Sequence, residues 1–543
     1  MRLERLGAFH QTRLSFMRAL LRRLKAEHWR FDRPLWTLDD KGVGVALYRA
    51  RGSERIYSLI CFAHDLDPTK RTDRVIAEEW DATFVLFDGE PGEADIARLQ
   101  ANVPKQEAGR CLASEIVMSR ANKSVRLFEH VVACLVDGRQ PAAADLDAVG
   151  YLMRTTAVYG NGKFGLADRE AIADRPELVG PFRAEMLTVW LIRAFTVDLA
   201  EHMARVKGQA RAVRLDPNLR RRLGVGNATG LGMAPFLVHH PALIHRWILA
   251  RETALGRVRS LEDASPDSMR TFRRLLLRAK AYAMAWNVPD AVQTQHIEKL
   301  RADLDRLTQA FDSGEFDGNR PWDAIYRRAE AQLSLEAQEL VVSLLIEPQG
   351  DVVDDLADQM AVDEGAGFRI DGAVRQHALK ELIARNYGWA LPVEYAQAEH
   401  SARFWYVSEE KLEPRLGERW EEPGGELEQP LAVGRDVARL WSALDGADAS
   451  QSVADLLLRM PEHRHIVRRV QSAARSPYAE IRDNLIDSDM RPIDLLRCKL
   501  SFFGATRFDP KSDRWVRITM FQFAPFPDEL AGIPADDWFL PPL

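Results

Sequence analysis

The sequence predicts a mainly α-helical protein, with a multi-helix body and a small N-terminal α/β section that contains a three-stranded antiparallel sheet. Two observations predict this fold class. Apolar residues recur at helical spacing over most of the chain from residue 107 onward, whereas short β-rich runs bounded by turn residues lie before about residue 105. The 543 residues are enough for two to four domains, at roughly 100 to 200 residues per domain.

The N-terminal section begins with a predicted amphipathic helix. In residues 10–28 apolar side chains recur every three or four positions, and most arginines fall on the other face. The β-rich runs 43–50 and 55–63 are separated by a short Arg-Gly-Ser-Glu connection, which predicts a hairpin. Residues 81–90 supply a third strand that ends at Asp-Gly. We therefore expect residues 1–106 to form a small α/β domain.

Residues 107–389 are predicted to form a helical domain. Most of its predicted helices begin at Ser, Asp or Pro, which are residues that favour a helix start. Each predicted helix is recognised by a sustained apolar period. The predicted helices cover residues 112–137, 143–158, 181–207, 235–257, 267–286, 290–312, 334–347, 350–362 and 372–385.

The last two predicted units are an irregular segment, 390–431, and a C-terminal region, 432–543. The irregular segment mixes aromatic and acidic residues with Pro and Gly, and we expect Phe404, Trp405 and Tyr406 to pack it over the helices. The C-terminal region is predicted to contain two helices and a terminal strand that is a candidate to join the N-terminal sheet. These elements cover residues 432–445, 452–474 and 514–524.

Charge and composition argue against several classes of function. The formal net charge of −6 gives no overall basic field to hold a polyanion, which argues against nucleic-acid binding. The four cysteines are far apart and form no CxxC pair, so neither a zinc knuckle nor a disulfide framework is expected. No window approaches 18 consecutive apolar residues, and the N-terminus lacks the apolar core of a secretory signal. We expect a cytoplasmic, bacterial protein without a membrane segment.

The segment from Tyr159 to Gly165 is the first candidate for a binding site. Its three glycines and one asparagine allow the backbone to approach a ligand closely. Lys163 could pair with a carboxylate or phosphate, Tyr159 could act as an acid or a hydrogen-bond donor, and Asn161 and Gly162 are candidate substrate contacts. The alternative is that these glycines only terminate a helix.

Residues 224–236 are the second candidate, because four glycines precede a helix predicted to start at Pro235. The free N–H groups and the dipole at such a helix start favour an anion. No dinucleotide or P-loop pattern is present, so no cofactor is assigned. His239 and His240 follow as candidate general bases, with packing histidines as the alternative and without the i, i+4 spacing of a zinc helix. The candidate substrate contacts are Gly226, Asn227, Thr229, Gly230 and Gly232.

A third candidate is the polar stretch 475–507, in which charges of both signs lie beside apolar runs. Arg482 and Arg507 could hold a substrate carboxylate bidentately. A solvated helix surface with i, i+4 ion pairs is the alternative.

Together these segments suggest a cytosolic enzyme that acts on a small anionic metabolite, a carboxylate or a phosphate, by metal-independent acid/base chemistry. The reaction class does not follow from the sequence. One alternative is a non-catalytic ligand-sensing or scaffold protein that binds a partner through residues 390–431. A second is a nucleic-acid-acting or defence protein, supported by a basic run between Arg18 and Arg30. Wide apolar faces on predicted helices, notably 181–200, are compatible with a symmetric homodimer.

Overall fold

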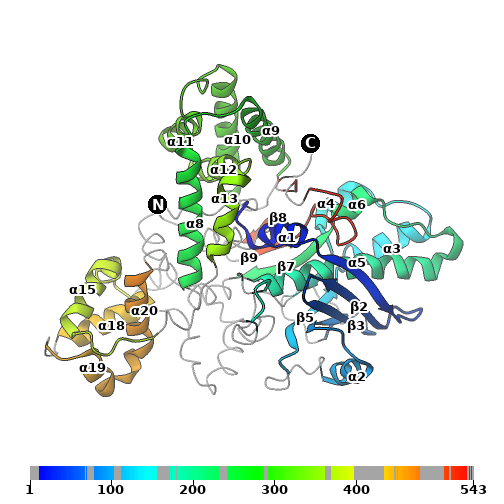
Figure 1. Ribbon diagram of the computed structural model, residues 1–543, viewed down its shortest axis with the longest axis horizontal. Coiled ribbons are helices and arrows are strands. Elements are labelled where there is room, and N and C mark those ends of the chain that lie inside the picture. Colours follow the sequence, from blue (N-terminus) through cyan, green and yellow to red (C-terminus); the bar gives the residue numbers. More distant parts are fainter. Residues whose placement is uncertain are drawn as a thin grey trace.

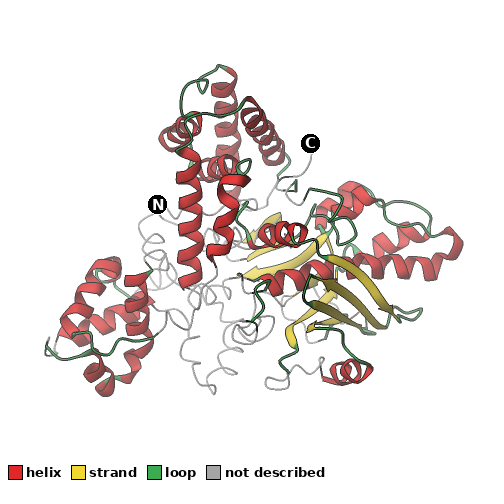
Figure 2. Ribbon diagram, viewed as in Figure 1, coloured by secondary structure: helices red, strands yellow, loops and turns green. Residues whose placement is uncertain are grey.

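A computed structural model gives the fold of the chain (Figures 1 and 2). It combines one large sheet with helices on both of its faces and two further groups of helices. The residues that the structure describes are 12–67, 69, 79–102, 112–155, 172, 174–178, 180, 182–230, 241–286, 291–360, 369–396, 433–445, 448, 450–476, 507–512, 515–534, 537, 538 and 540.

Within the described residues, nine strands form one mixed sheet in the order β1-β2-β3-β4-β5-β6-β7-β9-β8. Neighbouring strands of this described sheet are antiparallel, except that β6 and β7 run parallel. The strands are β1 (Arg30–Trp36), β2 (Gly44–Arg51), β3 (Ile56–Ala63), β4 (Ala82–Asp88), β5 (Glu115–Lys123), β6 (Tyr151–Thr155), β7 (Gly224–Gly230), β8 (Arg507–Ser512) and β9 (Trp515–Met520).

The prediction of a mainly α-helical fold with a three-stranded N-terminal sheet is wrong, because the sheet takes strands from residues 30 to 520. The hairpin predicted at 43–50 and 55–63 is confirmed as β2 and β3. Strands β5 and β6 were missed because both lie inside runs that were predicted as single helices, 112–137 and 143–158. Strands that are buried on both faces lose the alternation that distinguishes them from helices.

The long helix α5 (Arg183–Gly208) lies against one face of the sheet, where it contacts β3 to β7. Its side chains are buried almost all round, as expected for a helix with apolar residues on every face. Helices α1 (Phe16–Ala26) and α3 (Phe128–Val136) pack beside it. Helix α2 (Glu93–Asn102) covers the opposite face through Leu99, which packs on Val45 and Ile60 in a separate small core.

A second group of helices extends the main hydrophobic core away from the sheet (Figure 1). Serine side chains cap two of these helices, since Ser265 accepts the N–H of Ser268 in α9 and Ser334 accepts that of Ala337 in α12. The group consists of α8 (Pro241–Arg259), α9 (Pro266–Met284), α10 (Ala291–Asp312), α11 (Pro321–Gln332), α12 (Leu335–Ile346), α13 (Gly350–Val353) and the 3-10 helix η5 (Asp354–Met360).

A third group of helices has its own hydrophobic core, which includes Leu379, Leu440, Leu456 and Val470. It contacts the rest of the protein where α20 meets α8, and it lies at the lower left of Figure 1. Its members are α15 (Gln376–Tyr387), η6 (Gly388–Ala390), α18 (Val433–Asp445), α19 (Val453–Arg459), η8 (Pro461–His463) and α20 (Arg464–Arg475).

The remaining short helices are α4 (Ala143–Val149), which precedes β6, and η3 (Gln209–Arg211) and α6 (Pro217–Arg221), which lie between α5 and β7. No helix among the described residues is both long enough and apolar enough to cross a membrane. Phe404, Trp405 and Tyr406 lie outside the described residues. The division into the units 1–106, 107–389, 390–431 and 432–543 stays a prediction.

Candidate functional site

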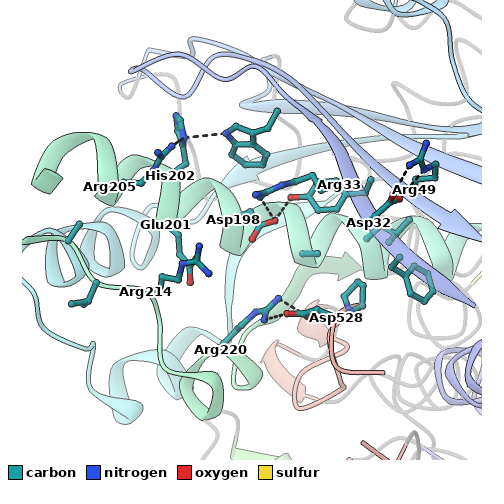
Figure 3. Close-up of a pocket in the computed structure, with 18 residues that line it drawn as sticks. Asp32, Arg33, Arg49, Asp198, Glu201, His202, Arg205, Arg214, Arg220 and Asp528 are labelled. Carbon is teal, nitrogen blue, oxygen red and sulfur yellow. Dashed lines mark hydrogen bonds and ion pairs between the residues drawn. The ribbon is translucent and has the colours of Figure 1, made fainter. Parts of the chain in front are cut away.

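A pocket of about 630 Å³ opens where β1 and β2 meet the C-terminal half of α5 (Figure 3). The segment after α5, helix α6 and the C-terminal segment around Asp528 complete its wall. Five arginines and four carboxylates are among the described residues that line it. The lining residues are Phe31, Asp32, Arg33, Trp36, Tyr48, Arg49, Leu191, Ala194, Asp198, Glu201, His202, Arg205, Ala212, Val213, Arg214, Arg220, Pro527 and Asp528.

Asp198 connects three elements of the pocket wall. Its Oδ2 accepts hydrogen bonds from Arg33 Nη1 on β1 at 2.8 Å and from Tyr48 Oη on β2 at 2.6 Å. The Arg33 guanidinium also lies over the Trp36 ring, 4.4 Å from its centroid. Burial, followed by the charge of Asp198, raises the pKa of Tyr48 well above its usual value. Tyr48 therefore keeps its proton and serves as a hydrogen-bond donor.

His202 is held in one tautomer by its neighbours. Its Nε2 lies 2.8 Å from the Asp39 carbonyl oxygen, which can only accept a hydrogen bond, so Nε2 carries the proton. Its Nδ1 then accepts from Trp36 Nε1 at 3.2 Å and from Arg205 Nη2 at 3.3 Å. Because both ring nitrogens already form hydrogen bonds, His202 holds Trp36 and Arg205 in place and is not positioned to exchange a proton with a substrate.

Glu201 is the pocket residue best placed to exchange a proton. Its Oε1 accepts the backbone N–H of Leu215 at 3.1 Å, and its side chain is half-buried at the pocket wall. Burial raises the pKa of Glu201, the Leu215 N–H lowers it in part, and the charge of Asp198 raises it further. A partly buried carboxyl group with a raised pKa, facing a pocket, is suited to general acid/base catalysis.

The raised pKa predicts how Glu201 affects stability. The contribution of Glu201 to the free energy of unfolding is fully present below its pKa in the unfolded chain, about 4.3. That contribution is lost as pH rises through its higher pKa in the folded protein. The variant Glu201→Gln should therefore be more stable than the wild type at pH 7, since glutamine keeps an acceptor for Leu215 and removes the buried charge. The difference in melting temperature should disappear below about pH 4. Equal melting temperatures at pH 7 would contradict the assignment.

Arg220 and Asp528 form a bidentate ion pair on the opposite side of the pocket, with Nη1–Oδ2 and Nη2–Oδ1 distances of 2.8 and 3.1 Å (Figure 3). The guanidinium of Arg220 lies over the Phe526 ring, 3.9 Å from its centroid. That contact fixes the plane of the guanidinium.

Two other arginines of the pocket, unlike Arg33, Arg49 and Arg220, are not paired with a carboxylate among the described residues. Arg205 and Arg214 are exposed, and within the described part of the chain neither guanidinium forms an ion pair with a carboxylate. Arg214 does lower the pKa of Glu201 through its charge, so the two side chains lie near each other. The pocket therefore presents two cations whose charge is available to a ligand.

The suggested site residues that the structure describes, Gly226, Asn227, Thr229, Gly230 and Arg507, do not line this pocket. Thr229 and Gly230 lie on β7 together with Gly226 and Asn227, and Arg507 begins β8. Eight of the suggested residues lie outside the described residues and stay predictions. They are Tyr159, Asn161, Gly162, Lys163, Gly232, His239, His240 and Arg482.

Residues 224–230 form the interior strand β7, and their role as substrate contacts stays a prediction. Gly226 is required by packing, because a Cβ atom there would lie 2.5 Å from the Tyr151 ring. Asn227 is 5% exposed, and its Nδ2 has no hydrogen-bond partner among the residues that the structure describes.

The pocket residues were missed because they come from positions 31 to 528 in the sequence. One local signal was present. Asp198, Glu201, His202 and Arg205 occupy positions i, i+3, i+4 and i+7, so they form a polar stripe on one face of α5.

In the described portion of the chain, no cluster of three or more His, Cys, Asp or Glu side chains is arranged to hold a metal ion. Comparisons with protein-family models, with curated proteins and with solved structures found no match to this sequence.

Proposed function

We propose that this protein is an enzyme that binds a small anionic molecule in the pocket between β1 and α5. The observation that carries the proposal is the presence of Arg205 and Arg214, two exposed cations without a carboxylate partner in the described residues. An anion between them would gain charge-assisted hydrogen bonds. A cytoplasmic location is part of the same proposal.

The ligand also has an apolar part in this proposal. Phe31, Trp36, Leu191 and Pro527 provide apolar surface in the same pocket. The pocket volume of about 630 Å³ suits a small organic molecule, since such pockets span roughly 300 to 1,000 Å³. A purely inorganic anion would leave this surface in contact with water.

Glu201 supports an enzyme rather than a simple binding protein. It faces the same pocket as the two arginines, and burial holds its pKa above the usual range. Arg214 beside it would stabilise the carboxylate form once the proton has been transferred. We assign Glu201 the role of the acid or base, and we assign Arg205 and Arg214 the role of binding the anionic group.

Thermal-shift measurements with a panel of carboxylates and phosphates test this proposal. At 100 times its dissociation constant, a true ligand stabilises the protein by about 2.7 kcal/mol. Replacing each arginine by methionine removes a charge-assisted hydrogen bond, so each should weaken binding by about tenfold. The double variant Arg205→Met/Arg214→Met should therefore lose the response to the anion that stabilises the wild type most.

Lys207→Met is the matched control for the two arginine substitutions. Lys207 is a cation on the same helix, pairs with Glu129, and does not line the pocket. Its variant should respond to the anion as the wild type does. An undiminished response in the double arginine variant would place the anion elsewhere, and no response of the wild type to any anion would refute the proposed function.

A further inference from the structure

Arg220 is an anion-binding group that the pocket keeps in a fixed orientation. The Phe526 ring supports it from one side, and the same ring also lies 3.7 Å from the buried Arg193 guanidinium. Both outer nitrogens of Arg220 point to one carboxylate, that of Asp528. A planar guanidinium held in this way is preorganised for bidentate binding of a carboxylate.

Asp528 is the pocket carboxylate that can most easily leave its arginine. Its side chain is 63% exposed, compared with 24% for Asp198 and 48% for Asp32. Ion pairs this exposed contribute little to stability. Asp198 accepts a second hydrogen bond from Tyr48, whereas the side-chain contacts described for Asp528 are those with Arg220.

The backbone beside Asp528 does not need to move for the Asp528 carboxylate to leave Arg220. Arg221 Nε on α6 donates to Glu529 Oε2 at 3.3 Å, and Trp190 Nε1 on α5 donates to the Pro525 carbonyl at 2.9 Å. The backbone of this segment is therefore anchored on both sides of Pro527, whereas the Asp528 carboxylate is exposed. A rotation of that side chain is enough to uncover Arg220.

We propose that the ligand is a carboxylate and that Arg220 binds it in the place that the Asp528 carboxylate occupies in the structure. This inference rests on the proposed function and adds a second anionic group to the ligand, a carboxylate, besides the group assigned to Arg205 and Arg214. Asp198 and Glu201 line the same pocket, and both are electrostatically coupled to Arg220. A carboxylate with a single negative charge meets less repulsion from them than a phosphate ester with a charge near −2.

Calorimetric titration with benzoate tests the inference, with benzamide as the neutral probe of the same shape. The variant Asp528→Asn removes the competing charge, so its affinity for benzoate should rise by up to about fivefold. Its affinity for benzamide should not change. The variant Arg220→Lys keeps the charge but lacks the bidentate geometry, and it should bind benzoate more weakly than the wild type.

Asp312→Asn is the matched control, because Asp312 pairs with Arg273 outside the pocket and is 48% exposed. It should leave benzoate binding unchanged. An unchanged or lower benzoate affinity in Asp528→Asn overturns the inference, as does the absence of benzoate binding in both the wild type and Asp528→Asn. The proposed function fails separately, only if Arg205→Met/Arg214→Met still responds to the stabilising anion or no anion stabilises the wild type.

Discussion

Replacement of Arg193 by methionine is expected to lower the free energy of unfolding by about 3 kcal/mol, because several buried carbonyl groups lose their hydrogen-bond donor. Arg193 is fully buried on α5, and its guanidinium donates to the carbonyls of Leu223 at 2.6 Å, Ala524 at 2.8 Å and Arg221 at 3.2 Å. Burial lowers the pKa of Arg193 well below its usual value, and the charge of Arg220 lowers it further. Methionine fills much of the volume but cannot donate.

The same substitution should also loosen the C-terminal segment that forms part of the pocket wall. Arg193 ties the segment before β7 and the C-terminal segment to α5, and the latter carries Pro527 and Asp528 into the pocket wall. Urea unfolding measures the loss of stability, and hydrogen exchange of residues 524–530 measures the loosening of the segment. Lys207→Met on the same helix serves as the control and should change neither. Unaltered exchange in Arg193→Met would show that other contacts hold the segment.

Breaking the ion pair between Arg251 and Glu339 is expected to destabilise the second helical group by about 3 to 5 kcal/mol. Arg251 on α8 donates from Nη2 to Glu339 Oε2 on α12, and their side chains are 3% and 1% exposed. At this depth, Arg251→Met removes the cation that faces the buried Glu339 carboxylate. A surface pair would contribute about 1 kcal/mol or less.

The double variant Arg251→Met/Glu339→Met separates the charge effect from packing. Replacing both partners by apolar residues of similar size removes the uncompensated charge, so most of the lost stability should return. Urea unfolding of the wild type, both single variants and the double variant gives the coupling between the two positions. A double variant as unstable as the sum of the single variants would mean that packing, not the isolated charge, causes the loss.

The sequence predicted well those elements whose signal is local. Helix α5 was expected at 181–207 and is found at Arg183–Gly208, because a long apolar run allows few alternatives to a buried helix. The β2–β3 hairpin was equally clear. Strand β6 was merged with the preceding helix α4, since the apolar run continues through Gly150, the left-handed residue at which the helix ends.

The pocket could not be predicted in the same way, because tertiary contacts assemble it. Arg220 and Asp528 are separated by 308 residues, and Arg33 and Asp198 by 165. Their pairing depends on the sheet order, in which the C-terminal strand joins β7, and that order is not visible in any local pattern. The polar stripe on α5 marks one wall of the pocket but does not indicate what faces it.

The most direct test of the account is a crystal structure of the protein with the anion that gives the largest thermal shift. We expect the anion to lie between β1 and α5, with its charged group within hydrogen-bond distance of Arg205 or Arg214 and its apolar part against Trp36. An anion bound away from this pocket, for example beside Asn227 or Thr229 on β7, would contradict the account and favour the site suggested by the glycine-rich sequence.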